Sequence, residues 1–377
     1  MSKEEEILLH CARTKVNEKI KNKIIDLLNS DIDWDYLINL ASHNRLMPLL
    51  IHNINFICPE LIPDNFLVYF KKFFYDNATK NLLFETELIK IMKLLESNGI
   101  KSITYKGPVL SQIAYGNITL RQFRDVDIFV RKSDVIKTLK LMNSYGYELY
   151  PHVSIENSLY MKLDSEYRFK SNSGTLIEIN WNFSGNYFPL TNNRVLFDNI
   201  QLYKINNEIQ VSVPSQINHF LMLCIHCAKH DWDRLSWICD ISEFIQNETI
   251  NWEETILLAK ELGVKRILLI NISLANNLFG LKVPELLWPH IKEDPIVLPL
   301  SIEIKNRIFG RTSFSLINRL FFNLKIRENK MDGLKSIING FVKPSIVDYE
   351  KIRLPEYLFF FYVFIRPFLL IIRYTLI

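Results

Sequence analysis

The sequence predicts an α+β protein in which a β-rich central segment lies between two helical regions. Apolar residues recur at helical spacing early in the chain, short alternating runs follow, and helical patterning returns after Pro214. Helices and strands that are segregated along the chain in this way are typical of α+β proteins. The expected regions are an N-terminal helical region (1–98), a central domain (99–213), a second helical domain (214–343) and a hydrophobic C-terminal tail (344–377).

The N-terminal region is predicted to be helical throughout. Residues 4–55 read as helices, and Trp34, Leu37 and Ala41 belong to an apolar stripe at helical spacing. Residues 64–98 continue the helical pattern with several aromatic side chains. These helices are expected to pack beside the central domain.

The central domain begins with a predicted strand at 100–105, which leads into a helix at 107–115. Pro108 fits the first helical position, because its missing N–H has no partner there in any case. Further strands are predicted at 125–130, 147–150 and 175–181, and hairpin-like runs at 159–170 and 200–213 are expected to widen the sheet.

Two carboxylates stand at alternate positions of the predicted strand 125–130. Side chains alternate between the faces of a strand, so Asp125 and Asp127 project together while Val126 and Ile128 face the other side. Paired carboxylates of this kind suit Mg²⁺, which prefers hard oxygen ligands. The alternative is a pair of strand-edge acids that form surface ion pairs.

Glu178 is a third candidate carboxylate. In the predicted strand 175–181, Glu178 and Asn180 share one face, while Ile177 and Trp181 lie on the other. Glu178 is therefore a candidate third metal ligand or general base. The alternative is a glutamate on the solvated face of an edge strand.

A phosphate-binding turn is predicted at Lys106-Gly107, immediately before the helix 107–115. Free backbone N–H groups at a helix start attract anions, and Gly107 has no side chain to keep a phosphate away. Lys106 would add a positive charge for a triphosphate.

These features occur in a fixed order along the chain: Lys106-Gly107, Ala114-Tyr115-Gly116, Arg121, Asp125-Val126-Asp127 and Glu178-Ile179-Asn180-Trp181. The order resembles the family of uncharacterised nucleotidyltransferases, within the DNA polymerase β-type nucleotidyltransferase superfamily. The run from His226 to Asp240 resembles the helical signature that follows the catalytic domain in that family. The resemblance covers roughly residues 60–300.

The resemblance implies a polymerase β-type core, a small mixed sheet with flanking helices, in the central domain 99–213. It also implies that Asp125, Asp127 and Glu178 are the catalytic carboxylate triad. Two positions depart from the family pattern. The usual Gly-Ser pair is Gly107-Pro108 here, and Asn180 stands where family members often carry His.

The resulting hypothesis is a metal-dependent nucleotidyltransferase that uses Mg²⁺ or Mn²⁺ and moves a nucleoside monophosphate from a nucleoside triphosphate to an unidentified acceptor. Asp125, Asp127 and Glu178 would hold the metal ions, Lys106 and Gly107 would bind phosphates, and Arg121 would support the acidic loop or the phosphates. The acceptor is a small molecule, a peptide or tRNA. Two alternatives stay open: a catalytically silent nucleotide-binding or accessory module of a membrane-proximal complex, and a toxin-like enzyme that modifies tRNA.

The helical signature offers further nucleotide-binding candidates. His226, Lys229 and His230 lie within about one helical turn, so one face would present cationic groups to a nucleotide. The alternative is that the histidines are satisfied polar groups of a packed helix. A zinc site that includes Cys224 and Cys227 is disfavoured, because apolar helices commonly bury thiols.

Charge and cysteine content restrict the class of protein. The formal net charge is +4, so an extended nucleic-acid track is not expected. Residues 301–377 are the basic part, with 13 Lys or Arg and 6 Asp or Glu. An odd number of cysteines and a first segment unlike a signal peptide favour a cytoplasmic location.

The hydrophobic segment 357–377 is long enough to resemble a membrane span. Arg366 lies in its middle, and Pro367 is expected to break the helix there, so a span is disfavoured. The remaining interpretations are a helix buried against the protein, which we favour, and peripheral membrane contact on anionic lipid.

Overall fold

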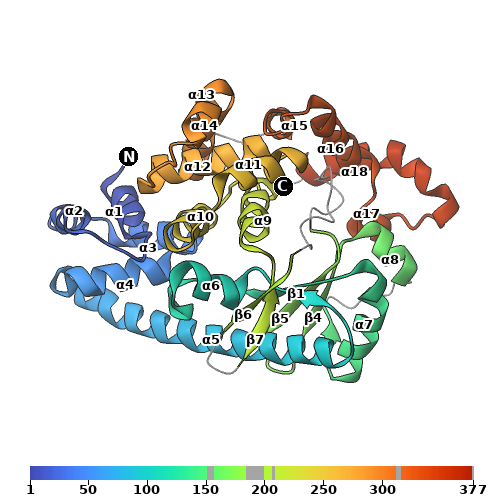
Figure 1. The fold of residues 1–377 in the computed structure, drawn as a ribbon, viewed down its shortest axis with the longest axis horizontal. Helices are drawn as coiled ribbons and strands as arrows, with labels where there is room; N and C mark the ends of the chain where they lie inside the picture. Colours follow the sequence, from blue (N-terminus) through green and yellow to red (C-terminus); the bar gives the residue numbers. More distant parts are fainter. Residues whose placement is uncertain (151–156, 184–198, 206–208, 311–315, 376–377) are drawn as a thin grey trace.

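The structure is a computed structural model that describes residues 1–150, 157–183, 199–205, 209–310 and 316–375 (Figure 1). A mixed five-stranded sheet lies in the lower half of the view, and helices cover it from both sides. The predicted α+β class and the small mixed sheet with flanking helices are therefore confirmed.

The sheet has the strand order β1-β2-β5-β4-β3. Its strands are β1 (Ser102–Ile103), β2 (Asp125–Val130), β3 (Glu148–Leu149), β4 (Glu166–Lys170) and β5 (Leu176–Asn180). β2 and β5 pair in parallel, and the other neighbours pair antiparallel. The two strands that carry the predicted carboxylates are thus direct neighbours, although about fifty residues separate them in the sequence.

The two predicted hairpins have different outcomes. The run 200–213 forms the antiparallel strands β6 (Gln201–Lys204) and β7 (Gln210–Val213), whose pair adjoins β1 through a 3.0 Å bond from Thr104 N–H to the Ser212 carbonyl. The prediction of a hairpin at 159–170 is wrong. The first half of this run belongs to the helix α8 (Asn157–Leu163), and only the second half is a strand, β4. Apolar spacing in so short a segment does not separate helix from strand.

The helices of the first hundred residues are α1 (Lys3–Cys11), α2 (Glu18–Leu28), α3 (Trp34–His43), α4 (Met47–Ile57) and α5 (Asp64–Ser97). The long helix α5 runs along the lower face of the sheet in Figure 1. Val126 and Ile128 of β2 are fully buried in one cluster with Leu88 and Ile91 of α5. The apolar side of β2 is thereby covered, which leaves its acidic side for the opposite face.

Two further helices, α6 (Gly107–Tyr115) and α7 (Val135–Ser144), flank the sheet. The helices that follow β7 are α9 (Gln216–Lys229), α10 (Leu235–Asn247), α11 (Trp252–Glu261), α12 (Lys265–Phe279), α13 (Leu287–Glu293) and α14 (Val297–Ile308). Trp232 anchors this group, since it is fully buried and its Nε1 donates to Asn271 Oδ1 at 2.9 Å. α9 and α10 lie above the sheet, on the side away from α5 (Figure 1).

The last helices are α15 (Leu316–Lys325), α16 (Lys330–Val342), α17 (Ile346–Lys351), the 3₁₀ segment η5 (Glu356–Phe361) and α18 (Tyr362–Thr375). The expected break at Pro367 does not occur, because α18 continues through it. Arg366 is turned inward and pairs with Asp348 at 3.0 Å, whereas Phe364 and Phe368 are exposed. The tail is therefore buried on one side only, and none of the described helices has the length and apolar character needed to cross a membrane.

Candidate active site

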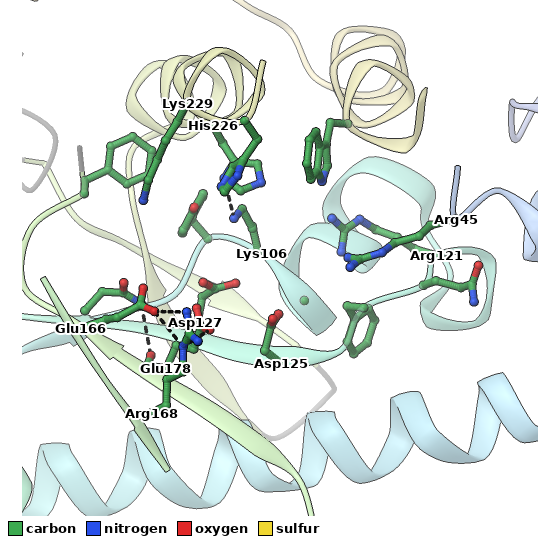
Figure 2. Close-up of a pocket in the computed structure, with 18 residues that line it drawn as sticks. Arg45, Lys106, Arg121, Asp125, Asp127, Glu166, Arg168, Glu178, His226 and Lys229 are labelled. Carbon is green, nitrogen blue, oxygen red and sulfur yellow. Dashed lines mark hydrogen bonds and ion pairs between the residues drawn. The ribbon is translucent and has the colours of Figure 1, made fainter. Parts of the chain in front are cut away.

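All nine predicted site residues line one pocket between the sheet and α9. β2 and β5 form its acidic floor, the start of α6 forms one wall, and α9 with Trp237 of α10 forms the roof (Figure 2). The predicted residues are Lys106, Gly107, Arg121, Asp125, Asp127, Glu178, His226, Lys229 and His230. Residues from distant parts of the sequence therefore meet at the acidic face of the sheet.

The three carboxylates occupy adjacent positions on the pocket floor. Asp125 and Asp127 lie on the same face of β2, and Asp127 is in register with Glu178 across the parallel β2–β5 pair. Burial together with the neighbouring carboxylate Asp127 raises the pKa of Asp125, and burial with Asp127 raises the pKa of Glu178 to about 8. The acidic groups repel one another, and a cation between them would remove that repulsion.

Glu178 is held by a cation of the neighbouring strand. Arg168 of β4 is in register with Glu178, and its Nε lies 3.1 Å from Glu178 Oε1. The same Nε donates to Glu166 Oε1 at 2.8 Å. Arg168 therefore holds one oxygen of Glu178, Oε1, toward β4.

The donor chemistry of the floor fits Mg²⁺ or Mn²⁺, because carboxylate oxygens are the ligands these ions prefer. In the part of the chain that the structure describes, no three His, Cys, Asp or Glu side chains are arranged as a metal-ligand set. Asp125 and Asp127 supply two donors on one face, whereas Glu178 is engaged with Arg168. Glu178 would become the third carboxylate ligand of the metal ion only after its ion pair with Arg168 is broken.

The raised pKa of Glu178 predicts how stability depends on pH in the absence of a divalent cation. The folded protein holds the Glu178 proton more tightly than the unfolded chain, whose glutamates titrate near 4.5. This contribution to stability is complete below about 4.5 and is lost as the pH rises through about 8. The melting temperature should be measured in EDTA for the parent and for Glu178→Gln. As the pH rises from about 5 to about 9, the melting temperature of the parent should fall relative to that of the variant. A constant difference between the two proteins across this range would contradict the prediction.

The start of α6 has the properties of an anion site. Gly107 has a φ of +57°, and a Cβ there would lie 3.6 Å from the Asp125 carbonyl, so the turn is suited to glycine. Lys106 occupies the N-cap, and no side chain caps the first N–H groups of α6. The departure to Pro108 removes both a hydroxyl and one backbone N–H, so the anion site depends on the N–H groups of Gly107 and Val109.

Lys106 is enclosed beneath α9. Its Nζ lies 2.9 Å from Nδ1 of His226, and burial lowers the pKa of Lys106 although Asp127 and Asp125 favour its charge. Burial, with the charge of Lys106, lowers the pKa of His226 well below its ordinary value. His226 is therefore a neutral acceptor for Lys106, which agrees with the alternative that the histidines are satisfied polar groups of a packed helix.

His230 and Lys229 complete the roof. Desolvation and the charge of Lys229 lower the pKa of His230 to about 3, so His230 is also neutral. The rings of His226 and His230 pack against Trp237 with centroids 5.1 and 5.2 Å away. Of His226, Lys229 and His230, Lys229 is the one that supplies positive charge to the pocket.

Arg121 lines the pocket, but most of its hydrogen-bonding capacity is directed away from it. Its Nε and Nη2 each donate to a different oxygen of Asp240 at 2.8 Å, and both side chains are buried. Tyr115 adds a hydroxyl that donates to Asp240 at 2.7 Å. Arg234, at the start of α10, donates instead to the His43 carbonyl at 3.1 Å. Arg121 thus fixes the approach to β2 against α10.

The pocket also contains residues that the sequence did not indicate as site residues. Arg45 comes from the turn between α3 and α4, and Glu166 and Arg168 come from β4. Alternation along β4 places Glu166 and Arg168 on one face of the strand, so the sequence pattern could have identified them as candidate site residues. Arg45 has no comparable signal in the sequence, because it reaches the pocket only through the packing of the N-terminal helices.

The fold is consistent with that of nucleotidyltransferases. The family model for uncharacterised nucleotidyltransferases matches residues 30–280, and the chain belongs to that family. Family membership supports transfer of a nucleoside monophosphate from a nucleoside triphosphate. None of the curated proteins matches the chain.

Proposed function

We propose that the protein is a metal-dependent nucleotidyltransferase that releases pyrophosphate when it transfers a nucleoside monophosphate. The observation that supports this proposal most strongly is the position of Asp125, Asp127 and Glu178. They lie side by side on two adjacent strands, in the pocket that also contains the start of α6. Carboxylates beside an anion-binding helix start are suited to bring a cation and a polyphosphate together.

Each residue has a role in this proposal. Asp125 and Asp127 hold Mg²⁺ or Mn²⁺, which when bound neutralises charge on phosphoryl oxygens. Gly107 and Lys106 bind the outer phosphates through backbone N–H groups and the ammonium group. Lys229 approaches the same phosphates from α9. Because phosphoryl transfer depends mainly on positioning and electrostatics, these contacts account for most of the catalysis.

Glu178 is proposed to have two states. In the first state, Glu178 is paired with Arg168 and does not contact the metal ion. In the second state, Glu178 has left Arg168, serves as the third carboxylate of the metal site and accepts the proton of the acceptor hydroxyl. Its raised pKa of about 8 brings its titration close to neutral pH, where a general base is most effective. Arg168 then becomes available for an anionic group of the acceptor or nucleotide.

The second candidate function is nucleotide binding without turnover. The observation that favours it is the Arg168–Glu178 ion pair, together with the lack of a three-residue metal-ligand set in the described residues. In such a protein, Lys106, Gly107 and Lys229 would still bind a nucleotide. The two candidates differ in one measurable property, which is the release of pyrophosphate.

The proposal is tested with nucleoside triphosphates labelled on the α- or the γ-phosphate, incubated with the protein, Mg²⁺ or Mn²⁺, and separate fractions of small molecules, peptides and tRNA. Nucleotidyl transfer should move the α-label to one fraction and release pyrophosphate. Transfer of the γ-label instead would contradict the proposal. Nucleotide binding with no label transfer to any fraction would support the second candidate.

A further inference from the structure

Arg45 reaches the pocket from outside the central domain. It follows α3 in the N-terminal helical region and lines the same pocket as the carboxylates. In Figure 2, Arg45 and Arg121 lie together beyond Asp125, whereas Glu166 and Arg168 lie at the opposite end. The start of α6 lies beside Asp125, because a Cβ on Gly107 would lie 3.6 Å from the Asp125 carbonyl.

The backbone of Arg45 adopts a left-handed conformation that favours glycine. Arg45 has a φ of +56°, its N–H donates to the Ser42 carbonyl, and the next N–H donates to the Ala41 carbonyl. Helix ends with the same pair of hydrogen bonds and a positive φ occur at Gly99, Gly146 and Gly263, and at one further residue with a Cβ, Asp231. This is the glycine position of a Schellman motif, where a residue with a Cβ is strained.

The side chain of Arg45 is also in an unfavourable position. Its Nε is buried and has no hydrogen-bond partner in the described part of the chain. Burial and the nearby cations Arg234 and Arg124 lower its pKa to about 10, while Asp125 favours its charge. A strained backbone and an unpaired buried donor in one residue both destabilise the ligand-free protein, which is typical of functional positions.

We propose that Arg45 binds the β- or γ-phosphate of the nucleoside triphosphate, so that the N-terminal helical region completes the nucleotide site. This inference rests on the proposed function. A phosphate is the chemically suited partner, because a guanidinium presents paired N–H donors that match its oxygens. The position beside Asp125 and the start of α6 favours the triphosphate over the acceptor, whose region would be the Glu166–Arg168 end.

The experiment measures dissociation constants of nucleoside tri-, di- and monophosphates by titration calorimetry with Mg²⁺. Arg45→Gly and Arg45→Asn both suit the left-handed backbone and remove the guanidinium. Each should weaken triphosphate binding by about 10- to 100-fold and leave monophosphate binding unchanged. The melting temperature of Arg45→Gly should equal or exceed that of the parent, because the backbone strain is relieved. Binding and stability are thus expected to change in opposite directions.

The matched control is Arg124→Gln, which removes a neighbouring positive charge from an exposed residue that does not line the pocket. It should change triphosphate affinity less than threefold or so, as expected for a screened surface charge. Parent-like triphosphate affinity in both Arg45 variants would overturn the inference alone. Equal losses for all three nucleotides, or a loss in Arg124→Gln as large as in Arg45→Gly, would overturn it too. Absence of triphosphate binding by the parent protein would overturn the proposed function as well.

Discussion

Replacement of Asp127 by Asn is expected to lower the rate of nucleotidyl transfer by about 10³-fold or more. Asp127 lies between Asp125 on its own strand and Glu178 on the next, so it is the carboxylate closest to both partners in the sheet register. An amide keeps the shape of the side chain but removes the charge that, in the proposed function, holds a divalent cation, and bound metal ions contribute several kcal/mol of transition-state stabilisation in such enzymes. Pyrophosphate release at saturating nucleotide and Mg²⁺ measures the loss.

The same substitution should not destabilise the fold. Asp127 is among the groups that raise the pKa of Asp125 and Glu178, so its neutralisation relieves repulsion in the metal-free protein. The melting temperature in EDTA should therefore stay level or rise. Asp233→Asn is the matched control, because Asp233 is an exposed member of another acid-x-acid run and does not line the pocket. An Asp127→Asn protein that keeps at least a tenth of the parent rate would rule out the assigned role.

The acidic floor could be predicted from the sequence because it depends on local geometry. Alternation in a strand places Asp125 and Asp127 together without knowledge of the fold, and Lys106-Gly107 before a helix predicts an anion site from local sequence alone. The position of Glu178 needed the pairing of β2 with β5, which spacing alone does not give. The ordered resemblance to a family supplied that information, and the register of Asp127 with Glu178 agrees with it.

Other features could not be predicted because they depend on contacts between distant segments. Arg366, whose charge disfavoured a membrane span, is buried and pairs with Asp348. Asp348 lies well before Arg366 in the sequence, so no local pattern predicted this pair. Likewise, the neutral state of His226 results from its enclosure with Lys106, more than a hundred residues away. Arg45 is the strongest case, since its left-handed backbone is unusual for arginine and no local pattern indicates it.

The ion pair between Arg121 and Asp240 is expected to be the most sensitive polar contact in the fold. Arg121→Met should lower the free energy of unfolding by about 3–5 kcal/mol, because it leaves a buried carboxylate without its cation. Both side chains are less than a tenth exposed, at 9% and 3%, so water does not replace the lost partner. The loss corresponds to a fall of about 4–6 °C in Tm, because the entropy of unfolding of a 377-residue protein is about 0.8 kcal/mol/K. Thermal and urea unfolding of parent and variant measure it.

A second substitution separates loss of the cation from loss of packing. Adding Asp240→Asn to Arg121→Met removes the uncompensated charge, yet still leaves an acceptor for the Tyr115 hydroxyl. The double variant should therefore recover about half or more of the stability that Arg121→Met loses. The exposed pair of Lys162 and Glu356 serves as the control, since Lys162→Met should change stability by less than about 1 kcal/mol. If Asp240→Asn restored nothing, the instability would come from the lost arginine side-chain packing, and the buried charge would not be its cause.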